Sequence, residues 1–191
     1  MDVKIKVLNG WKNTLDMARQ TVNKDSTGKE PSDSWKRRML LAEHSPIREL
    51  RFLIQFSAIK TWVSQHLARH DFGGEHHAID CAAVQYVATQ RTDRTNINRD
   101  EQKQSHPVQH SMTVNAQDLI NMSRKRLCEN ASKETREAWE DVKCGISLGD
   151  PQMADAMVPE CIYRGFCPEL KCCGFVNTEK YKKQRKLYIA R

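Results

Sequence analysis

Basic side chains at two points in the middle of the chain have the types and spacing needed to bind phosphate groups. Arg69 and His70 end an apolar segment with helical periodicity, and Arg94 follows in a polar stretch. An arginine guanidinium binds a phosphate through two parallel hydrogen bonds, which a lysine cannot do. The pattern indicates a site for an anionic ligand. The alternative is that Arg69 and His70 only interact with the C-terminal end of their helix dipole, and that Arg94 is an ordinary exposed arginine.

Two amides and a third arginine recur further along the chain. Asn115 and Asn121 are six residues apart on a predicted helix, so they need not point the same way and can contact different parts of a ligand. Arg126 lies about three helical turns after Asn115 and returns to the same face. The alternatives are that Asn115 only caps the helix, and that the charge run 124–126 is a solvated face.

Two further groups have the types of side chain that bind metals. His66 and His70 are four residues apart on one helix face, and Glu75, His76 and His77 follow. Two histidines at this spacing can share a zinc ion, as in a hydrolytic metal enzyme, although no His-Glu-x-x-His pattern is present.

Four cysteines within thirteen residues form the second group: Cys161, Cys167, Cys172 and Cys173. They can bind a structural zinc ion, although their spacing lacks a paired Cys-x-x-Cys. Reduced unligated thiols, a disulfide and an iron–sulfur cluster are the alternatives. The remaining cysteines are scattered and are expected to be buried or free thiols.

The elements that must position these residues alternate between strands and helices. Val3, Ile5 and Val7 alternate with charged residues, and the stretch from Leu50 to Phe56 is the clearest strand pattern in the sequence. The expected elements are a strand and a helix within 1–22, a loop over 23–34, short helices over 35–42 and from 150 to 159, a strand near 50–57, helices near 58–70 and 78–90, a turn over 71–77, a loop over 91–113, and a broken long helix from about 113 to 142. The remainder is expected to be a cysteine-rich loop and a basic tail.

The composition is that of one folded domain with a basic surplus. Charged residues make up 29% and hydrophobic residues 39% of the 191 residues, and 31 Lys+Arg against 24 Asp+Glu give a formal charge of +7. The surplus favours anionic partners, although much of it lies in the segment 180–186, which is expected to be a solvated end. No apolar run approaches the roughly 20 residues that span a bilayer, and residues 1–10 are already charged, unlike a signal peptide. The expected compartment is the cytoplasm.

The first motif carries a family resemblance. The turn Glu43-His-Ser-Pro-Ile-Arg48, then a strand, then a helix ending in Arg69-His70, resembles the first half of the site of the flavin-dependent thymidylate synthases. That family has an Arg-His-Arg triplet followed by Ser-x-Arg. Here Asp71 takes the third place of the triplet, and the nearest equivalent of Ser-x-Arg is Thr92-Asp93-Arg94, which comes later than the family's usual spacing.

A second motif supports the same resemblance. In the stretch 113–126, Asn115, Asn121 and Arg126 fall on the family's Asn, Asn and Arg positions, whereas Gln117 stands where the family usually has an arginine. The following Ala131-Ser-Lys-Glu-Thr-Arg136 resembles the family's Ala-Gln-x-Glu-Ile-Arg. The two motifs occur in the family's order over residues 42–142, and the segment between them is shorter than in typical members.

The resemblance implies an α+β fold in which helices pack on a small antiparallel sheet, assembled as a homotetramer with its sites between subunits. It would occupy residues 1–150, and residues 151–191 would form a cysteine-rich basic extension. The implied activity is transfer of a one-carbon unit from methylenetetrahydrofolate to C5 of dUMP, with NADPH reducing the bound FAD. The family uses no cysteine nucleophile.

The resemblance also implies roles for individual residues. The catalytic positions would be Arg94 and Arg126. The FAD-binding positions would be Ser45, Arg69, His70, Asn115 and Asn121. The nucleotide-binding positions would be His66, Arg69, Thr92, Arg94 and Arg126.

Three alternatives remain beside this activity. One is another C5 modification of a pyrimidine nucleotide, such as hydroxymethylation. Another is a non-catalytic derivative of the fold that binds nucleic acid, although no nucleic-acid-binding motif is present and such binding is not expected. The third is the hydrolytic metal enzyme with histidine ligands. The small size and divergent motifs suit a bacteriophage or mobile-element origin.

Overall fold

A four-stranded antiparallel sheet forms the base of the molecule. The computed structural model describes residues 1–70, 84–88 and 92–190; the predicted turn over 71–77, residues 78–83 and Glu75, His76 and His77 lie outside them. The strands are β1 (Asp2–Asn9), β2 (Arg51–Lys60), β3 (Val84–Val87) and β4 (Pro107–Asn115). Their order is β1-β2-β4-β3, so the two longest strands lie at the centre.

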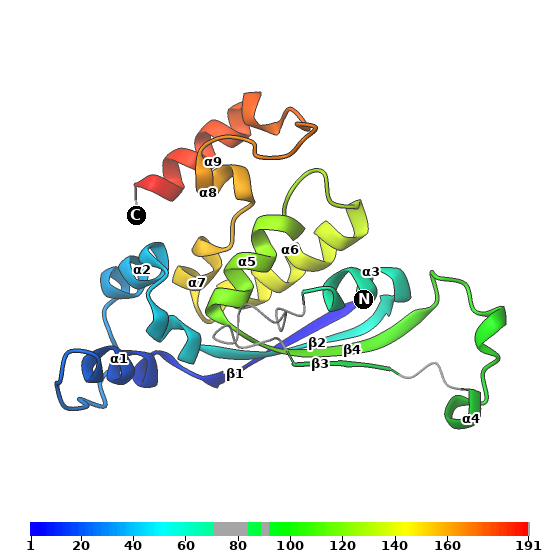
Figure 1. The fold of residues 1–191 in the computed structure, drawn as a ribbon, viewed down its shortest axis with the longest axis horizontal. Helices are drawn as coiled ribbons and strands as arrows, with labels where there is room; N and C mark the ends of the chain where they lie inside the picture. Colours follow the sequence, from blue (N-terminus) through cyan, green and yellow to red (C-terminus); the bar gives the residue numbers. More distant parts are fainter. Residues whose placement is uncertain (71–83, 89–91, 191) are drawn as a thin grey trace.

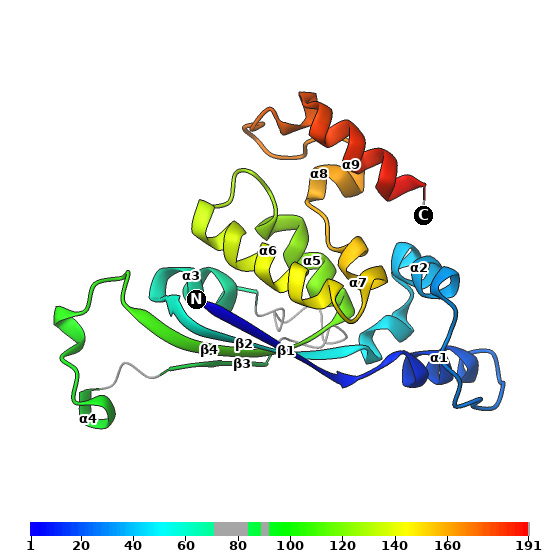
Figure 2. The same cartoon turned by 180° about the vertical axis from the view of Figure 1, so that it is seen from behind.

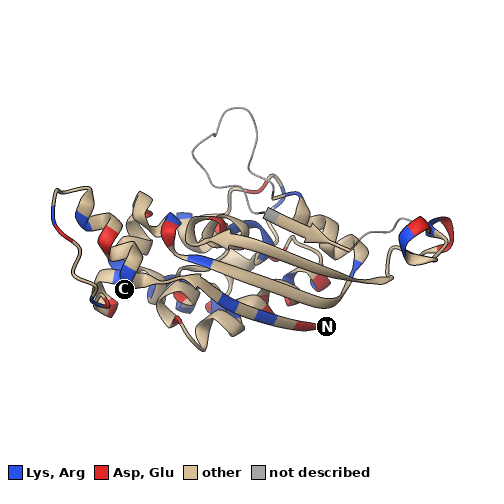
Figure 3. Ribbon diagram, turned by 90° about the horizontal axis from the view of Figure 1, so that it is seen from below, with Lys and Arg blue, Asp and Glu red and all other residues tan. Residues whose placement is uncertain are grey.

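Helices cover one face of this sheet (Figures 1 and 2). The α-helices are α1 (Trp11–Gln20), α2 (Asp33–Ala42), α3 (Thr61–Ala68), α4 (Thr92–Thr95), α5 (Ala116–Arg126), α6 (Lys133–Ser147), α7 (Pro151–Ala156), α8 (Glu160–Arg164) and α9 (Glu179–Ile189), and the 3-10 helices are η1 (Ser45–Glu49), η2 (Arg99–Glu101) and η3 (Phe175–Asn177). Figure 3 shows the other face, where the strands lie in front of the helices and β1 presents exposed Lys4 and Lys6. A sheet with one packed and one solvated face explains the alternation of apolar and polar residues along β2.

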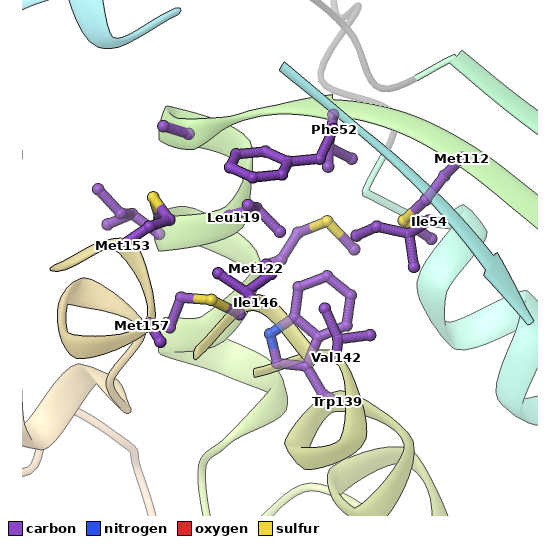
Figure 4. Packing of buried hydrophobic residues seen from close by; sticks show 14 of the residues in the cluster. Phe52, Ile54, Met112, Leu119, Met122, Trp139, Val142, Ile146, Met153 and Met157 are labelled. Carbon is purple, nitrogen blue, oxygen red and sulfur yellow. The ribbon is translucent and has the colours of Figure 1, made fainter. Parts of the chain in front are cut away.

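The main core lies between the sheet and α5, α6 and α7 (Figure 4). Phe52 and Ile54 of β2 point into it and are almost completely buried, and Trp139 of α6 fills its centre. The indole of Trp139 donates to Ser123 Oγ on α5 at 2.9 Å, which satisfies its one buried polar group. The core therefore fixes α5, the helix that carries the second motif, against the sheet.

A second, smaller cluster holds the C-terminal elements together. It consists of Val158, Cys161, Ile162, Tyr181 and Tyr188, from α8, α9 and the turn before α8. Met153 and Met157, in contrast, belong to the main core. The proposed division after residue 150 stays a prediction, and the packing changes from one cluster to the other between residues 157 and 158.

Three secondary-structure predictions were wrong. Residues 84–87 of the predicted helix 78–90 form strand β3, and residues 107–115 of the predicted loop and helix start form β4. In β4 the buried positions alternate regularly, but one of them is His110, and the polar residues around it hide the period of two. The basic end is also ordered: Thr178 caps α9 by accepting from Tyr181 N at 3.1 Å, and Tyr181 and Tyr188 anchor it.

The prediction of a long helix with a break is confirmed. It consists of α5 and α6, separated by residues 127–132. Among the described residues, no helix is both long enough and apolar enough to cross a membrane.

Candidate anion-binding site

Helix α5 begins where β4 ends, and Asn115 makes this junction. Its side chain accepts from Asp118 N at 2.9 Å, and Asp118 Oδ2 accepts from Asn115 N at 3.0 Å. This reciprocal capping box satisfies backbone donors that the first helical turn leaves free. The side-chain oxygen of Asn115 is thus committed to the helix start, and only 3% of the residue is exposed.

The C-terminal end of α5 meets the C-terminal end of α3 at a cluster of cationic and imidazole side chains. Arg126 Nη2 donates to the carbonyl oxygen of His66 at 2.5 Å, which ties the two helix ends together. His66 Nδ1 lies 3.0 Å from Thr135 Oγ1 on α6, which fixes its ring. Arg69 and His70 follow α3 directly, so both predicted parts of the site, the Arg-His pair and Arg126, come together in the fold.

The two arginines in this cluster repel each other. Burial and the charge of Arg69 lower the pKa of Arg126 below its usual value. No described carboxylate pairs with either guanidinium, and the buried Nε of Arg126 has no hydrogen-bond partner among the described residues. Two like charges held together without a counter-charge favour an anionic ligand.

The two histidines beside them are kept neutral. Burial, and secondly the charge of Arg126, lower the pKa of His70 to about 4. Burial, then Arg126 and then Arg69, also lower the pKa of His66. Near neutral pH His70 therefore acts as a hydrogen-bonding group, and the arginines supply the charge.

A second polar cluster surrounds the middle of α5. Glu43, which caps α2, accepts from Gln117 Nε2 at 2.6 Å and from Arg124. Asn121 Oδ1 accepts from Gln117 Nε2 at 3.3 Å and from Arg124 Nη1 at 3.1 Å. The Arg124 guanidinium stacks 3.7 Å above the ring of Tyr163 on α8. Gln117 thus takes part in a network that joins α2, α5 and α8.

The remaining predicted residues lie elsewhere. Ser45 is exposed at the start of η1, two residues after Glu43. Thr92 and Arg94 belong to the short helix α4, which projects at the far end of the molecule from α5 (Figures 1 and 2). Within one chain the structure does not bring Arg94 to Arg126.

Sequence reasoning missed part of the second cluster. Arg124 was considered only as part of a run that could be a solvated face, but its side chain is 14% exposed and contacts Glu43. Within the run, Lys125 fits that interpretation, because its side chain is 55% exposed. The signal that was present is the spacing of Gln117, Asn121 and Arg124, which places them on one helix face.

The four C-terminal cysteines that were predicted to bind zinc do not form a metal site in the structure. Within the described ranges, no group of three or more His, Cys, Asp or Glu side chains stands in position to hold a metal ion. Cys161 is buried, Cys167 is half-buried, and Cys172 and Cys173 are exposed.

Known structures of the same architecture support the resemblance. Two structures of the flavin-dependent thymidylate synthase ThyX from Helicobacter pylori with FAD and dUMP superpose with TM-scores of 0.63 and 0.60, each at 12% identity, and cover 82% and 83% of this chain and 99% and 100% of theirs. A UMP/dUMP methylase, PolB from Streptomyces cacaoi bound with 5-Br dUMP, superposes with a TM-score of 0.56 at 12% identity, covering 86% of this chain and 96% of its own. No family model and no curated protein matches the sequence.

These likenesses confirm the predicted fold class of helices on a small antiparallel sheet. The chain has the fold of the flavin-dependent thymidylate synthases.

Proposed function

We propose that this protein is a flavin-dependent enzyme that modifies C5 of dUMP or a related pyrimidine nucleotide. The one-carbon donor would be methylenetetrahydrofolate, and NADPH would reduce the bound FAD. Structures of the same fold hold FAD with dUMP, or 5-Br dUMP, which gives the class of ligand. The convergence of Arg69 and Arg126 without a described counter-charge is the observation that carries the proposal.

The residues present fit such ligands. FAD carries a pyrophosphate and dUMP a phosphate monoester, and both need guanidinium or backbone donors. Among the described residues the Nε of Arg126 has no hydrogen-bond partner, and it lies in a half-buried position, where a hydrogen bond to a ligand oxygen is stronger than in water. When bound, the flavin would supply the hydride that completes transfer of the carbon unit.

The chain's own contribution would be to position and polarise the nucleotide. Arg126 is held by the His66 carbonyl, so its guanidinium is fixed before the ligand arrives. A fixed cation beside a pyrimidine carbonyl would stabilise negative charge that develops on its oxygen when the nucleotide accepts a hydride. Neutral His70 can donate or accept a hydrogen bond beside it. Asn121 and Ser45 would contact FAD, as the resemblance implies, and Asn115, whose side-chain oxygen caps α5, would do so only through its amide nitrogen.

Arg94 and Thr92 would reach a site only in an oligomer. They lie on α4, which projects beyond one end of the sheet, away from α5 (Figure 1). The resemblance implies sites between the subunits of a homotetramer, and α4 of one subunit would then contribute to the site of another.

The visible absorption spectrum of the purified protein tests this proposal. FAD added to the protein is expected to give the shifted bands of a bound flavin, and dUMP is expected to shift them again. Arg126→Ala should abolish the dUMP-dependent shift, whereas Arg38→Ala, an exposed arginine on α2, should not. A protein that takes up no FAD at micromolar concentration contradicts the proposal.

The reaction itself is tested by release of tritium from C5-labelled dUMP. Release that requires reduced flavin and methylenetetrahydrofolate is the expected result. Mass spectrometry of the nucleotide product then separates a methyl group from a hydroxymethyl group at C5.

A further inference from the structure

The last turn of α3 is held by side chains from two other elements. Arg126 Nη2, at the end of α5, donates to the carbonyl oxygen of His66 at 2.5 Å. Gln85 Nε2, on β3, donates to the carbonyl oxygens of Leu67 at 3.3 Å and Ala68 at 3.5 Å. These carbonyls belong to consecutive residues and are among the four that a helix end leaves without an intrahelical partner. The guanidinium and the amide therefore stand side by side at this helix end.

Each of these two side chains has one polar atom that is buried and unsatisfied. Within the described ranges, Gln85 Oε1 and Arg126 Nε have no hydrogen-bond partner, although both atoms are shielded from solvent. A shielded polar atom without a partner is unfavourable, so a ligand that supplies the partner is bound more tightly. The two atoms together offer one acceptor and one donor, and they fit a ligand with the opposite pattern.

The orientation of the Gln85 amide is set by the sheet and by the helix. Gln85 pairs with Met112 of β4, which is fully buried, so its side chain points to the packed face of the sheet. If the amide were turned over, Oε1 in place of the NH2 group would face the carbonyl oxygens of Leu67 and Ala68, and acceptors would meet acceptors. Gln85 therefore presents an acceptor, and no donor, away from the helix.

The imide edge of uracil has the pattern that these two atoms require. Its N3–H is a donor, and a carbonyl oxygen on either side of it is an acceptor. On the corresponding edge of cytosine, N3 is an acceptor and the N4 amino group is a donor. An ionised phosphate offers only acceptor oxygens, so it would pair with Arg126 and leave Gln85 Oε1 unsatisfied. The donor and acceptor together favour a uracil base over both.

We propose that Gln85 determines specificity for uracil: its Oε1 accepts from N3–H while Arg126 donates to an adjacent carbonyl oxygen of the base. This inference rests on the proposed function, because it places the base of the nucleotide beside Arg126. Both atoms are shielded, so a side chain that covers them must move as the base enters. In cytosine, N3 would face Gln85 Oε1 with no proton between two acceptors, and a site that desolvates both of them rejects such a base.

Replacement of Gln85 by methionine tests the role of its acceptor. Equilibrium dialysis of dUMP and of dCMP, with FAD present, gives the ratio of the two affinities. Methionine has a similar length but only a weakly accepting sulfur, so in Gln85→Met the preference for dUMP over dCMP should fall by about tenfold, the share of one hydrogen bond. Gln109→Met changes an exposed glutamine on the neighbouring strand β4 and should keep the preference. A merely structural role would weaken both nucleotides equally, so an unchanged ratio in Gln85→Met overturns the inference.

A measurement on the unsubstituted protein covers the case in which Gln85→Met fails to fold. N3-methyl-dUMP keeps both carbonyl oxygens of the base but lacks the N3–H donor. It should bind about tenfold more weakly than dUMP, because Gln85 Oε1 then remains without a partner. If N3-methyl-dUMP bound as tightly as dUMP, the N3–H group would not be recognised and the inference would be wrong.

The same titrations separate this inference from the proposed function. A protein that takes up FAD and binds dUMP, but whose preference for dUMP does not depend on Gln85, refutes the role of Gln85 alone. A protein that binds neither FAD nor dUMP refutes both.

Discussion

At the scale of single residues, burial decides which groups carry charge. His70 is 8% exposed and His110 is fully buried, and the pKa of each is lowered to about 4, by burial first in both cases. His110 Nδ1 lies 2.8 Å from Ser64 Oγ, and its Nε2 has no hydrogen-bond partner among the described residues. Both rings are therefore neutral near pH 7, and protonating either in the folded state is costly.

These two histidines predict a loss of stability in acid. In the unfolded chain a histidine takes up a proton near pH 6.5, but in the folded chain it does so only near pH 4. Between these values the unfolded state binds more protons, so stability is complete above pH 6.5 and falls as the pH is lowered to 4, by up to about 3 kcal/mol per histidine. Denaturant titrations at several pH values in this range measure how the free energy of unfolding changes with pH.

His110→Gln isolates one of the two contributions. Glutamine can still hydrogen-bond Ser64 but does not titrate. The slope of unfolding free energy against pH between pH 6.5 and 4 should therefore decrease by the contribution of one histidine proton. His44→Gln changes an exposed residue and serves as the control. An unchanged slope in His110→Gln would show that His110 is not kept neutral by the fold.

Arg126→Lys tests whether the shape of the cation matters as well as its charge. Lysine keeps the positive charge but lacks the planar fork that holds the His66 carbonyl and a ligand oxygen together. Nucleotide affinity should fall by about tenfold, about 1.4 kcal/mol, and by more in Arg126→Ala. The affinity is measured by titrating dUMP and following the flavin absorption spectrum. If Arg126→Lys and the unchanged protein bound dUMP equally well, Arg126 would contribute only its charge.

At the scale of elements, α5 organises the molecule. The capping box at Asn115 fixes its start against the end of β4, and Trp139 fixes its buried face. Its polar side chains then face two groups of neighbours, Glu43 and Tyr163 around its middle and the end of α3 at its C-terminus. A single helix therefore sets the spacing between the two polar clusters.

Glu43 is predicted to stabilise this arrangement. Its carboxylate accepts from both Gln117 and Arg124, so Glu43→Ala leaves two part-buried donors without that partner and should cost about 1–3 kcal/mol of unfolding free energy. Glu137→Ala removes a carboxylate from a surface pair, 3.7 Å from Lys133, and should cost less than about 0.5 kcal/mol. Chemical denaturation of both variants compares them, and equal losses would show that the Glu43 network does not brace the helices.

At the scale of the whole molecule, the predicted site residues lie in two places. Arg69 and Arg126 meet where α3 and α5 end, whereas Arg94 is exposed on α4, which projects beyond one end of the sheet (Figure 1). If all three serve one site, that site combines two copies of the chain.

Mixed oligomers test this combination. Arg94→Ala and Arg126→Ala are each expected to be inactive alone, because every site lacks one arginine. Co-expressed and purified as a mixed assembly, they should regain part of the activity, since some sites receive both intact residues. An active Arg94→Ala protein, or no recovery in a verified mixed oligomer, contradicts a shared site.

The sequence by itself determined strand β2 and the break between α5 and α6, because local periodicity and helix-ending residues are encoded in short stretches of chain. The α+β class and a common site for the Arg-His pair and Arg126 were implied by the family resemblance of the motifs. The sequence did not determine β3, β4 or the ordered helix α9, because His110 interrupts the apolar pattern of β4 and the two tyrosines that anchor α9 stand among lysines.

Only the tertiary structure decided the environments of the polar residues. Gln117 and Arg124 bind Glu43, which is more than seventy residues away in the sequence. Burial and contacts between distant segments set these pairings and the pKa values that follow from them. Local spacing carries no information about which distant segment packs against a side chain.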